Sequence, residues 1–157
     1  MAAKPLFVVA LLILSLSHLS SSNAILDESS VPSPSTAHAE LNNYGFPTGL
    51  LPADVLGYSL NTTSGEFAIR LGDDCKLTLP PDNYKATYSR RITGKIVAGR
   101  IADLDGIRVR AFFKWWSITG IRSSGDDLVF EVGMVTAKYP SKNFVESPAC
   151  EGKRSDS

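Results

Sequence analysis

The sequence contains few of the residues that catalytic and metal sites commonly need. Two histidines occur in its 157 residues, and His38 is the one that lies beyond the first 24. A single histidine argues against Ser–His–Asp and Cys–His hydrolases, which rely on a histidine base. The chain also has no Gly-x-Ser-x-Gly motif, no Walker loop and no Gly-x-Gly-x-x-Gly phosphate loop. We therefore predict a protein that is not an enzyme, with no catalytic residue, no metal and no cofactor.

Long hydrophobic runs are absent except at the start of the chain. Lys4 precedes an apolar run from Leu6 to Leu16, and a polar stretch then ends in Ser22-Asn23-Ala24. A charged start, a short apolar run and small residues at −3 and −1 predict a cleaved signal peptide over residues 1–24. The rival interpretation is an uncleaved anchor, but the run is about half of the roughly 20 residues that cross a bilayer. We expect a secretory-pathway protein without a transmembrane segment, either extracellular or in the endomembrane lumen.

Cysteine is scarce, with only Cys75 and Cys150 present. An even number of cysteines in a secreted chain favours a disulfide, which here would close a long loop. The alternative is two buried free thiols. A metal or redox role is disfavoured because neither cysteine has a Cys or His neighbour at ligand spacing.

One N-glycosylation sequon is present, Asn61-Thr62-Thr63. It precedes Ser64-Gly65, where a turn is expected, so the Asn61 side chain should be accessible. The sequence therefore predicts a glycan at Asn61.

The net charge of the chain is also close to zero. Without residues 1–24, which contain one basic and no acidic residue, the chain has 15 basic and 16 acidic residues. This balance argues against a nucleic-acid partner, and against a charge on the whole protein that would steer it to a membrane. The charges are nevertheless segregated, because residues 85–122 contain two acidic residues, Asp103 and Asp105, and nine basic ones: Lys85, Arg90, Arg91, Lys95, Arg100, Arg108, Arg110, Lys114 and Arg122.

Two interpretations of this basic segment remain open. The charges can lie on exposed strands and pair with acidic neighbours in space. Alternatively, they form a face for an anionic lipid headgroup, an acidic polysaccharide or an acidic protein. The candidate residues of that face are Arg91, Lys95, Arg108, Arg110, Lys114 and Trp116.

The remaining 133 residues are enough for one domain with a hydrophobic core. Residues 25–35 are rich in Ser and Pro and predict a flexible leader, while residues 153–157 form a polar tail. The single domain is expected over residues 36–152, as a monomer.

A helix is predicted between Thr36 and Gly45, with Ser35 or Thr36 as its N-cap and Gly45 as its stop. Pro52 suits the first position of a second short helix or turn. Strands are then expected over residues 58–61, 66–71, 75–79, 84–89, 91–97, 107–118 and 128–137. Short strands without intervening helices predict a mainly β domain, a single antiparallel β-barrel or roll with a short N-terminal helical segment.

An aromatic run, Phe112-Phe113-Lys114-Trp115-Trp116, lies inside one of these strands. Alternation would direct Phe113 and Trp115 to one side and Phe112 and Trp116 to the other. We expect one pair to fill the interior and the N-terminal helix to cover the other. An exposed aromatic pair beside the basic residues would instead suit a lipid interface or carbohydrate stacking.

Six short motifs follow one another along the domain: Gly49-Leu50-Leu51-Pro52, Ser64-Gly65-Glu66-Phe67, Ile92-Thr93-Gly94-Lys95-Ile96, Gly99-Arg100-Ile101-Ala102-Asp103-Leu104, Phe130-Glu131-Val132-Gly133 and Pro148-Ala149-Cys150-Glu151-Gly152. Their order and spacing, from roughly Thr36 to Gly152, resemble the plant family catalogued as domain of unknown function 538 (DUF538). Trp115-Trp116, and Ala98 in place of an aromatic residue, depart from the family's pattern.

The resemblance implies a flowering-plant protein with a compact β-barrel or roll and a helical N-terminal part, often with a signal peptide. It places Cys75 and Cys150 where secreted members carry their cysteines, and it makes the apoplast a possible address. It supplies no biochemical activity, because the family has no settled one, and no catalytic residues to carry over. Lipid binding has been suggested for the family by analogy to bactericidal permeability-increasing proteins, and roles in stress and epidermal-hair development have been proposed.

These observations predict a non-enzymatic domain of the secretory pathway that binds an amphipathic or anionic, lipid-like ligand. The alternative is a structural or regulatory protein-interaction domain that uses the basic face. A third hypothesis is an unrecognised hydrolase, in which carboxylates of Asp73-Asp74 and Asp126-Asp127 would act together.

Overall fold

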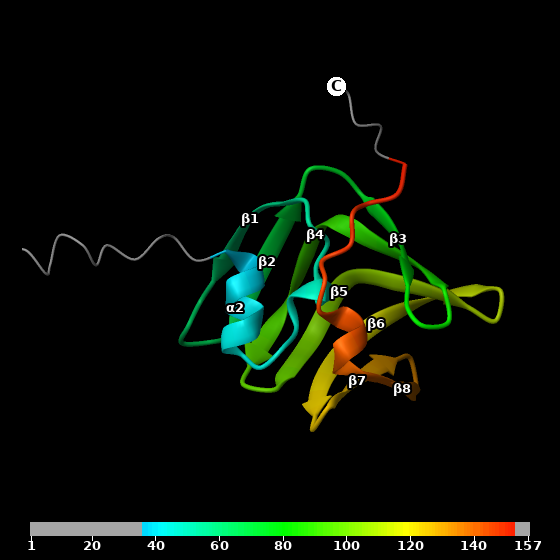
Figure 1. Cartoon of the computed structure of the whole chain (residues 1–157). Helices are drawn as coiled ribbons and strands as arrows, with labels where there is room; N and C mark the ends of the chain where they lie inside the picture. Colours follow the sequence, from blue (N-terminus) through cyan, green and yellow to red (C-terminus); the bar gives the residue numbers. More distant parts are fainter. Residues whose placement is uncertain (1–35, 153–157) are drawn as a thin grey trace, which may run out of the picture. The chain divides into compact units, whose positions relative to one another are not determined.

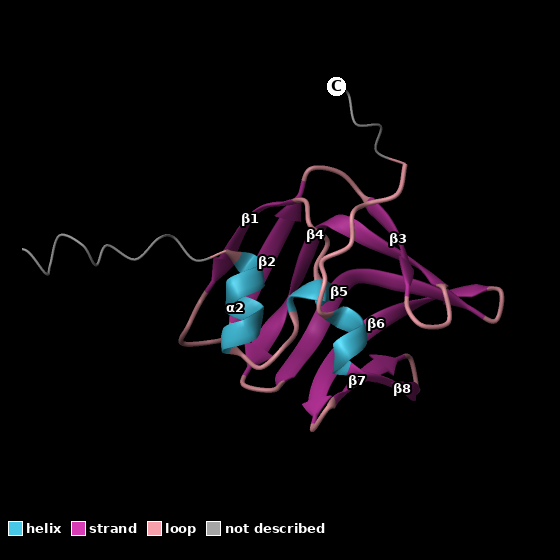
Figure 2. Cartoon of the chain, viewed as in Figure 1, coloured by secondary structure: helices cyan, strands magenta, loops and turns pink. Residues whose placement is uncertain are grey.

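The computed structural model describes residues 36–152 (Figure 1). The predicted signal peptide, leader and polar tail lie outside the described residues. Within residues 36–152, eight antiparallel strands form one sheet, accompanied by one short α-helix and two 3₁₀-helices (Figure 2). The predicted mainly β, antiparallel class is confirmed. The sheet is an open roll and does not close into a barrel, because its edge strands do not pair with each other. No helix between residues 36 and 152 is long and apolar enough to cross a membrane.

The strands are β1 (Val55–Leu60), β2 (Glu66–Leu71), β3 (Cys75–Leu79), β4 (Tyr84–Val97), β5 (Arg100–Ala111), β6 (Lys114–Ser124), β7 (Asp127–Val132) and β8 (Val135–Pro140). Their order in the sheet is β1-β2-β4-β5-β6-β7-β8, and β3 also pairs with β4. β3 and β2 occupy one edge of β4 in succession, because β4 pairs with β3 over residues 84–88 and with β2 over residues 91–95.

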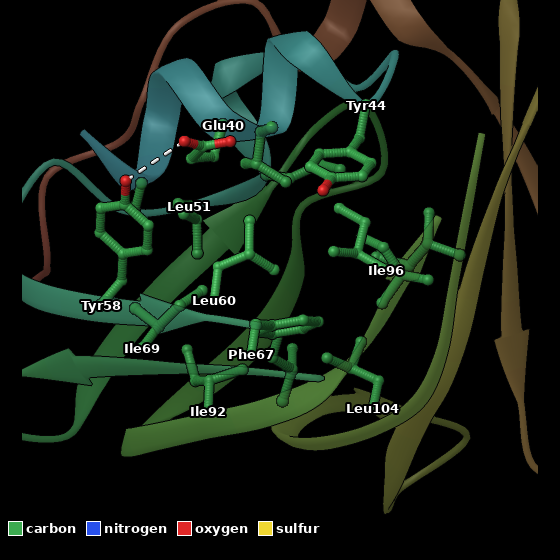
Figure 3. A pocket seen from close by; sticks show the side chains of 16 residues that line it. Glu40, Tyr44, Leu51, Tyr58, Leu60, Phe67, Ile69, Ile92, Ile96 and Leu104 are labelled. Atoms are coloured by element: carbon green, nitrogen blue, oxygen red, sulfur yellow. Dashed lines mark hydrogen bonds between the residues drawn. The ribbon is translucent and has the colours of Figure 1, made fainter. Parts of the chain in front are cut away.

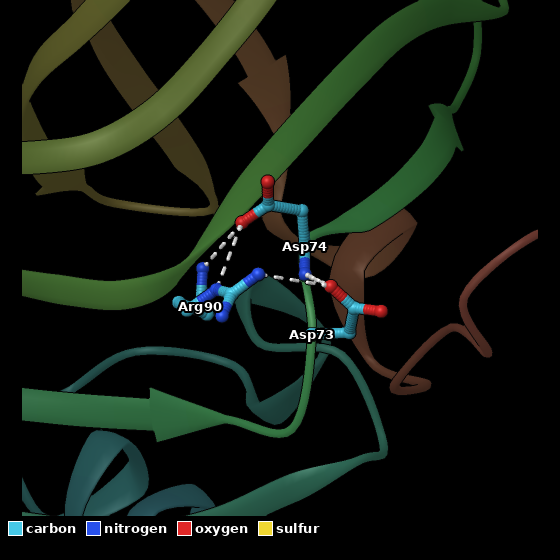
Figure 4. Close-up of polar contacts among 3 residues, drawn as sticks. All are labelled: Asp73, Asp74 and Arg90. Carbon is cyan, nitrogen blue, oxygen red and sulfur yellow. Dashed lines mark hydrogen bonds and ion pairs between the residues drawn. The ribbon is translucent and has the colours of Figure 1, made fainter.

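The connection between β2 and β3 is held against β4 by Arg90 (Figure 4). The backbone N–H of Arg90 donates to Asp74 Oδ1 at 2.9 Å, and the Arg90 guanidinium lies 3.4 Å from Asp73 Oδ1. These side chains are exposed, so the ion pair itself adds little stability. The contacts instead hold the connection at the point along β4 where pairing with β3 ends and pairing with β2 begins.

The N-terminal helix α2 (Ala37–Asn43) forms as predicted. Thr36 is its N-cap and accepts a hydrogen bond from the backbone N–H of Ala39 at 3.1 Å. Gly45 follows the helix with φ of +87°, a left-handed conformation that glycine adopts without a steric penalty.

The predicted short helix beginning at Pro52 is wrong, because the 3₁₀-helix η1 (Thr48–Leu50) precedes that residue. Its position depends on a long-range contact. A side chain on Gly49 would collide with the carbonyl oxygens of Phe144 and Glu146, so the C-terminal segment packs directly on this turn.

One face of the sheet is covered by α2, η1, η2 (Ser141–Phe144) and the C-terminal segment that follows η2 (Figure 1). Phe144 on η2 packs against Phe130 on β7, with ring centroids 5.4 Å apart. The largest fully buried side chains are Phe46, Leu77, Ile92, Leu128, Pro52 and Cys75. The hydrophobic core therefore lies between this face of the sheet and the helices and C-terminal segment that pack on it.

The disulfide between Cys75 and Cys150 is present, so the predicted bridge is confirmed. It joins β3 to the C-terminal segment across 75 residues of sequence. Beside it, the backbone N–H of Glu151 donates to the carbonyl of Lys76 at 2.8 Å. The disulfide therefore links the C-terminal segment, which covers one face of the sheet, to strand β3.

Two predicted long strands are in fact hairpins. The strand expected over residues 107–118 contains the turn Phe112-Phe113 between β5 and β6, and β5 begins earlier, at Arg100. The strand expected over residues 128–137 contains the turn Gly133-Met134 between β7 and β8. Conversely, the two strands expected over residues 84–89 and 91–97 form the single strand β4.

Candidate functional site

The turns of the antiparallel sheet gather at two opposite ends. The connections β3–β4 (residues 80–83), β5–β6 (112–113) and β7–β8 (133–134) lie at one end, which we call the hairpin end. The connections β1–β2 (61–65), β4–β5 (98–99) and β6–β7 (125–126) lie at the other, which we call the far end.

The β5–β6 turn consists of two phenylalanines in an unfavourable backbone conformation. Phe112 and Phe113 have φ values of +52° and +66°, and the flanking Ala111 and Lys114 pair directly. Two-residue turns with two positive φ values strongly favour Asn-Gly, because bulky L-residues are penalised there. The two side chains are 87% and 95% exposed. Both backbone conformation and solvation therefore disfavour phenylalanine here, so these side chains do not serve folding.

Both parts of the expectation for this aromatic run are wrong: neither pair fills the interior, because all four side chains are exposed, and the N-terminal helix covers neither pair. α2 packs against η1 and β1 and does not reach the hairpin end. The alternation argument fails because Phe112 and Phe113 occupy a turn rather than a strand. The other interpretation, an exposed aromatic pair, describes the structure.

Other apolar side chains adjoin the Phe112-Phe113 turn. Met134 and Val135, at the neighbouring β7–β8 turn, are exposed, while Trp115 and Trp116 on β6 are about 40% exposed. The Trp116 indole Nε1–H donates to the carbonyl of Ala111 at 3.1 Å. Its ring also lies against Gly133, where an added Cβ would be 3.3 Å from the indole. Trp116 therefore joins the two hairpin turns into one apolar surface.

The nine basic residues of the segment 85–122 divide into two sets. Four form ion pairs: Arg100 and Arg122 with Glu131, Lys85 with Glu151, and Arg90 with Asp73 and Asp74. The pairing interpretation is confirmed for these. The other five have no ion pair within the described range 36–152: Arg91, Lys95, Arg108, Arg110 and Lys114. They are the five basic residues proposed for the face.

The structure does not bring these five residues together. On β4, Lys95 lies opposite Ala102 of β5, and Arg110 lies eight residues further along β5. At roughly 3.3 Å per residue this separation is about 26 Å along the strand. Arg91 and Lys95 line an open hollow toward the far end. Arg108, Arg110 and Lys114 instead lie next to the hairpin turn.

The hollow around Arg91 and Lys95 also contains Glu66 and Asp103, whose charges oppose theirs. At the hairpin end, Arg110 lies opposite Trp115. Phe67 also lines the hollow but is partly buried, whereas the aromatic rings beside the cations of the hairpin end are exposed. This end, with Phe112, Phe113, Trp115, Trp116, Arg108, Arg110 and Lys114, is the candidate site.

Two apolar cavities adjoin the core. One, of about 50 Å³, lies beneath α2 between the helix and the sheet, and the Tyr58 hydroxyl donates to Glu40 Oε1 at 3.4 Å at its edge (Figure 3). The other, of about 140 Å³, opens at the hairpin end and is lined by Phe112, Tyr84, Val109, Phe130, Val135 and Tyr139, among others. A cavity of about 150 Å³ accepts a benzene ring, so neither space holds a complete acyl chain.

Replacing the turn by its favoured sequence should stabilise the fold. We expect Phe112→Asn/Phe113→Gly (F112N/F113G) to raise the free energy of unfolding by about 1–2 kcal/mol, because the penalty for positive φ at a bulky residue is removed. Urea denaturation followed by circular dichroism measures this. F112A/F113A is the control, since alanine keeps the backbone penalty. Equal stability of the two variants would contradict the prediction.

The side chains of His38, Tyr88 and Tyr139 make hydrogen bonds within the fold. His38 Nε2 lies 2.9 Å from the carbonyl oxygen of Pro52. The Tyr88 hydroxyl donates to the carbonyl of Leu50 at 2.8 Å, and burial raises the pKa of Tyr88. Burial, with contributions from Tyr84 and Asp82, raises the pKa of Tyr139 to about 12. Both phenols therefore stay protonated at physiological pH.

The carboxylates proposed for a hydrolase do not meet in one site. Asp73 and Asp74 contact Arg90 of β4. Asp127, which follows the β6–β7 turn, instead pairs with Lys138 of β8, with 3.4 Å between its Oδ2 and the lysine Nζ. Within residues 36–152, no three His, Cys, Asp or Glu side chains group as metal ligands would.

Asn61 lies in the exposed β1–β2 turn at the far end. Its Oδ1 accepts hydrogen bonds from the backbone N–H groups of Thr63 and Ser64, at 3.0 and 3.1 Å. The predicted turn is confirmed. The glycan remains a prediction.

Comparison with known proteins gives one result. No curated protein and no solved structure matches the chain. The family model described as "Protein of unknown function, DUF538" matches residues 37–145. The match runs from the start of α2 past the end of η2, so it includes all eight strands but not Cys150. The chain therefore belongs to the DUF538 family, as the order of its motifs predicted.

Proposed function

We propose that this protein is a non-enzymatic domain of the secretory pathway that binds an anionic, amphipathic lipid at the hairpin end. The observation that carries the proposal is the exposed Phe112-Phe113 turn beside Arg108, Arg110 and Lys114, which have no ion pair within residues 36–152. An apolar tip flanked by cations is complementary to a molecule with an apolar chain and an anionic headgroup.

The expected energies favour reversible binding. Burying a phenylalanine side chain contributes about 1.5–3 kcal/mol. A lysine or arginine near an anionic membrane surface contributes about 1 kcal/mol. Two phenylalanines and three cations together give a gross stabilisation of about 6–9 kcal/mol. The loss of translational and rotational freedom reduces this value, so the protein should bind and release.

Two features support the secretory address. The Cys75–Cys150 disulfide is of the kind that persists in oxidising compartments. The predicted signal peptide over residues 1–24 would direct the chain there.

The charged half of the site can be tested by flotation with vesicles of phosphatidylcholine containing phosphatidylglycerol. Removing two cations at the hairpin end (R108A/R110A) should lower the partition coefficient roughly thirtyfold at low ionic strength, at about 1 kcal/mol per charge. The matched variant R91A/K95A removes two cations from the hollow and should bind like the wild type.

Salt should weaken the wild-type binding, because the attraction between exposed charges is screened. A loss of flotation in R91A/K95A but not in R108A/R110A would move the site to the hollow. No flotation of the wild type at low ionic strength, together with no binding of a soluble anionic lipid, would reject the function.

A further inference from the structure

We infer that the hairpin end docks on the surface of an anionic bilayer, with Phe112 and Phe113 inserted beneath the headgroups and the far end directed away from the membrane. This inference rests on the proposed lipid function and specifies its partner as an intact bilayer rather than a single enclosed lipid. The β5–β6 and β7–β8 hairpins provide the surface that would contact the bilayer.

The dimensions of the cavities favour a bilayer over an enclosed lipid. The apolar spaces of about 50 and 140 Å³ are too small for an acyl chain, since about 150 Å³ accommodates one benzene ring. The hollow around Arg91 and Lys95 is larger, about 760 Å³, but it is open to solvent and lined by charged side chains. The apolar groups of the site protrude instead, because Phe112 and Phe113 are almost fully exposed at the end of a hairpin. A protruding apolar tip can insert into a surface but cannot enclose a ligand.

The apolar surface extends over two adjacent turns. Met134 is fully exposed on the β7–β8 turn, and Trp116 contacts both this turn and the β5–β6 hairpin. Trp115 and Trp116 each combine an apolar ring with an N–H donor, which is the character that places tryptophan at membrane–water interfaces. The register of β6 places the β7–β8 turn level with Trp116, so Phe112 and Phe113 would insert deepest, with Met134 and the tryptophans at the level of the headgroups.

The positions of the cations fit the depth to which Phe112 and Phe113 would insert. Lys114 directly follows Phe113, and Arg110 precedes Phe112 by two residues, about 7 Å along the strand. Interfacial segments bury their apolar side about 5–10 Å deep, so both charges would lie at the phosphate layer. Within the three turns of the hairpin end, Asp82 is the one carboxylate, and it accepts a hydrogen bond from the Tyr139 hydroxyl at 3.4 Å.

The opposite end of the sheet suits the aqueous side. Asn61, the predicted glycosylation site, lies in the β1–β2 turn at the far end. A glycan there would point into water when the hairpin end is on the membrane. The docking orientation and the predicted glycan are therefore compatible.

Both tryptophans of the chain lie in this site, so intrinsic fluorescence reports on it without background. With phosphatidylglycerol-containing vesicles we expect a blue shift of the tryptophan emission. Quenching should be stronger by lipids carrying a nitroxide near the headgroup than at the chain end. F112N/F113G, designed to fold at least as well, should partition at least about tenfold less. V97S removes an exposed apolar residue near the far end and should bind as the wild type does.

Two results would overturn the docking geometry and leave lipid binding intact. One is flotation with unshifted, unquenched tryptophans and an unaffected F112N/F113G variant, which would place the contact elsewhere. The other is binding of short-chain phosphatidylglycerol below its critical micelle concentration without binding to vesicles. Failure of the wild type to bind either probe would reject both the docking and the proposed function.

Discussion

Replacing both cysteines by alanine (C75A/C150A) is expected to lower the free energy of unfolding by about 4 kcal/mol. The bridge joins positions separated by 75 residues, and the chain-entropy model assigns about this value to a loop of that length. Alanine is chosen because Cys75 is fully buried and serine would leave a buried hydroxyl. Urea denaturation gives the change in free energy.

The control is the wild type unfolded in the presence of a thiol reductant, which should reproduce the stability of C75A/C150A. The expected structural consequence is local as well. The C-terminal segment should lose protection from hydrogen exchange first, because the bridge and the Glu151–Lys76 hydrogen bond hold it to β3. An unchanged unfolding midpoint would show that packing alone retains the segment.

The second large effect is expected for Phe46→Ala, which should lower the free energy of unfolding by about 3–5 kcal/mol. Phe46 is 2% exposed and is among the largest fully buried side chains. It lies three residues after the end of α2, and its backbone N–H donates to the carbonyl of Leu41 at 2.9 Å. Truncation keeps this backbone hydrogen bond and leaves a cavity in the core, so the loss of stability reports packing.

Chemical denaturation with circular dichroism measures this loss. Leu56→Ala is the matched control, since Leu56 lies on β1 but is mostly exposed, and its loss should be within about 0.5 kcal/mol. A cost below about 1 kcal/mol for Phe46→Ala would show that the loop after α2 collapses to fill the space.

The features that sequence reasoning predicted correctly are those with local chemical signals. Thr36 and Gly45 mark the ends of α2 through a side-chain oxygen and a left-handed glycine. β2 and β3 were predicted to the residue, because Gly65 and Pro80-Pro81 bound alternating or β-branched stretches. The cysteine pair followed from an even count in a chain with a signal peptide.

The candidate site was predicted only in part. The five basic residues were identified from charge alone, but their separation into two groups depends on the register of β4 and β5. The Phe112-Phe113 turn was missed because turn residues are recognised by Gly, Asn, Asp or Pro, and this turn has none of them. Its unusual composition is the observation on which the proposed site rests.

The sequence by itself determined the β class, the capped helix, the cysteine pair and the family, because each depends on residue type and short spacing. The tertiary structure decided where the hairpins turn, that the sheet stays open, and which four cations of the segment 85–122 pair with carboxylates. These depend on strand register and on contacts between residues far apart in sequence, such as Gly49 with the backbone of Phe144. Strand register also decided that Phe112 and Phe113 are exposed to solvent. The same aromatic residues can be buried when they lie in a strand and exposed when they lie in a turn.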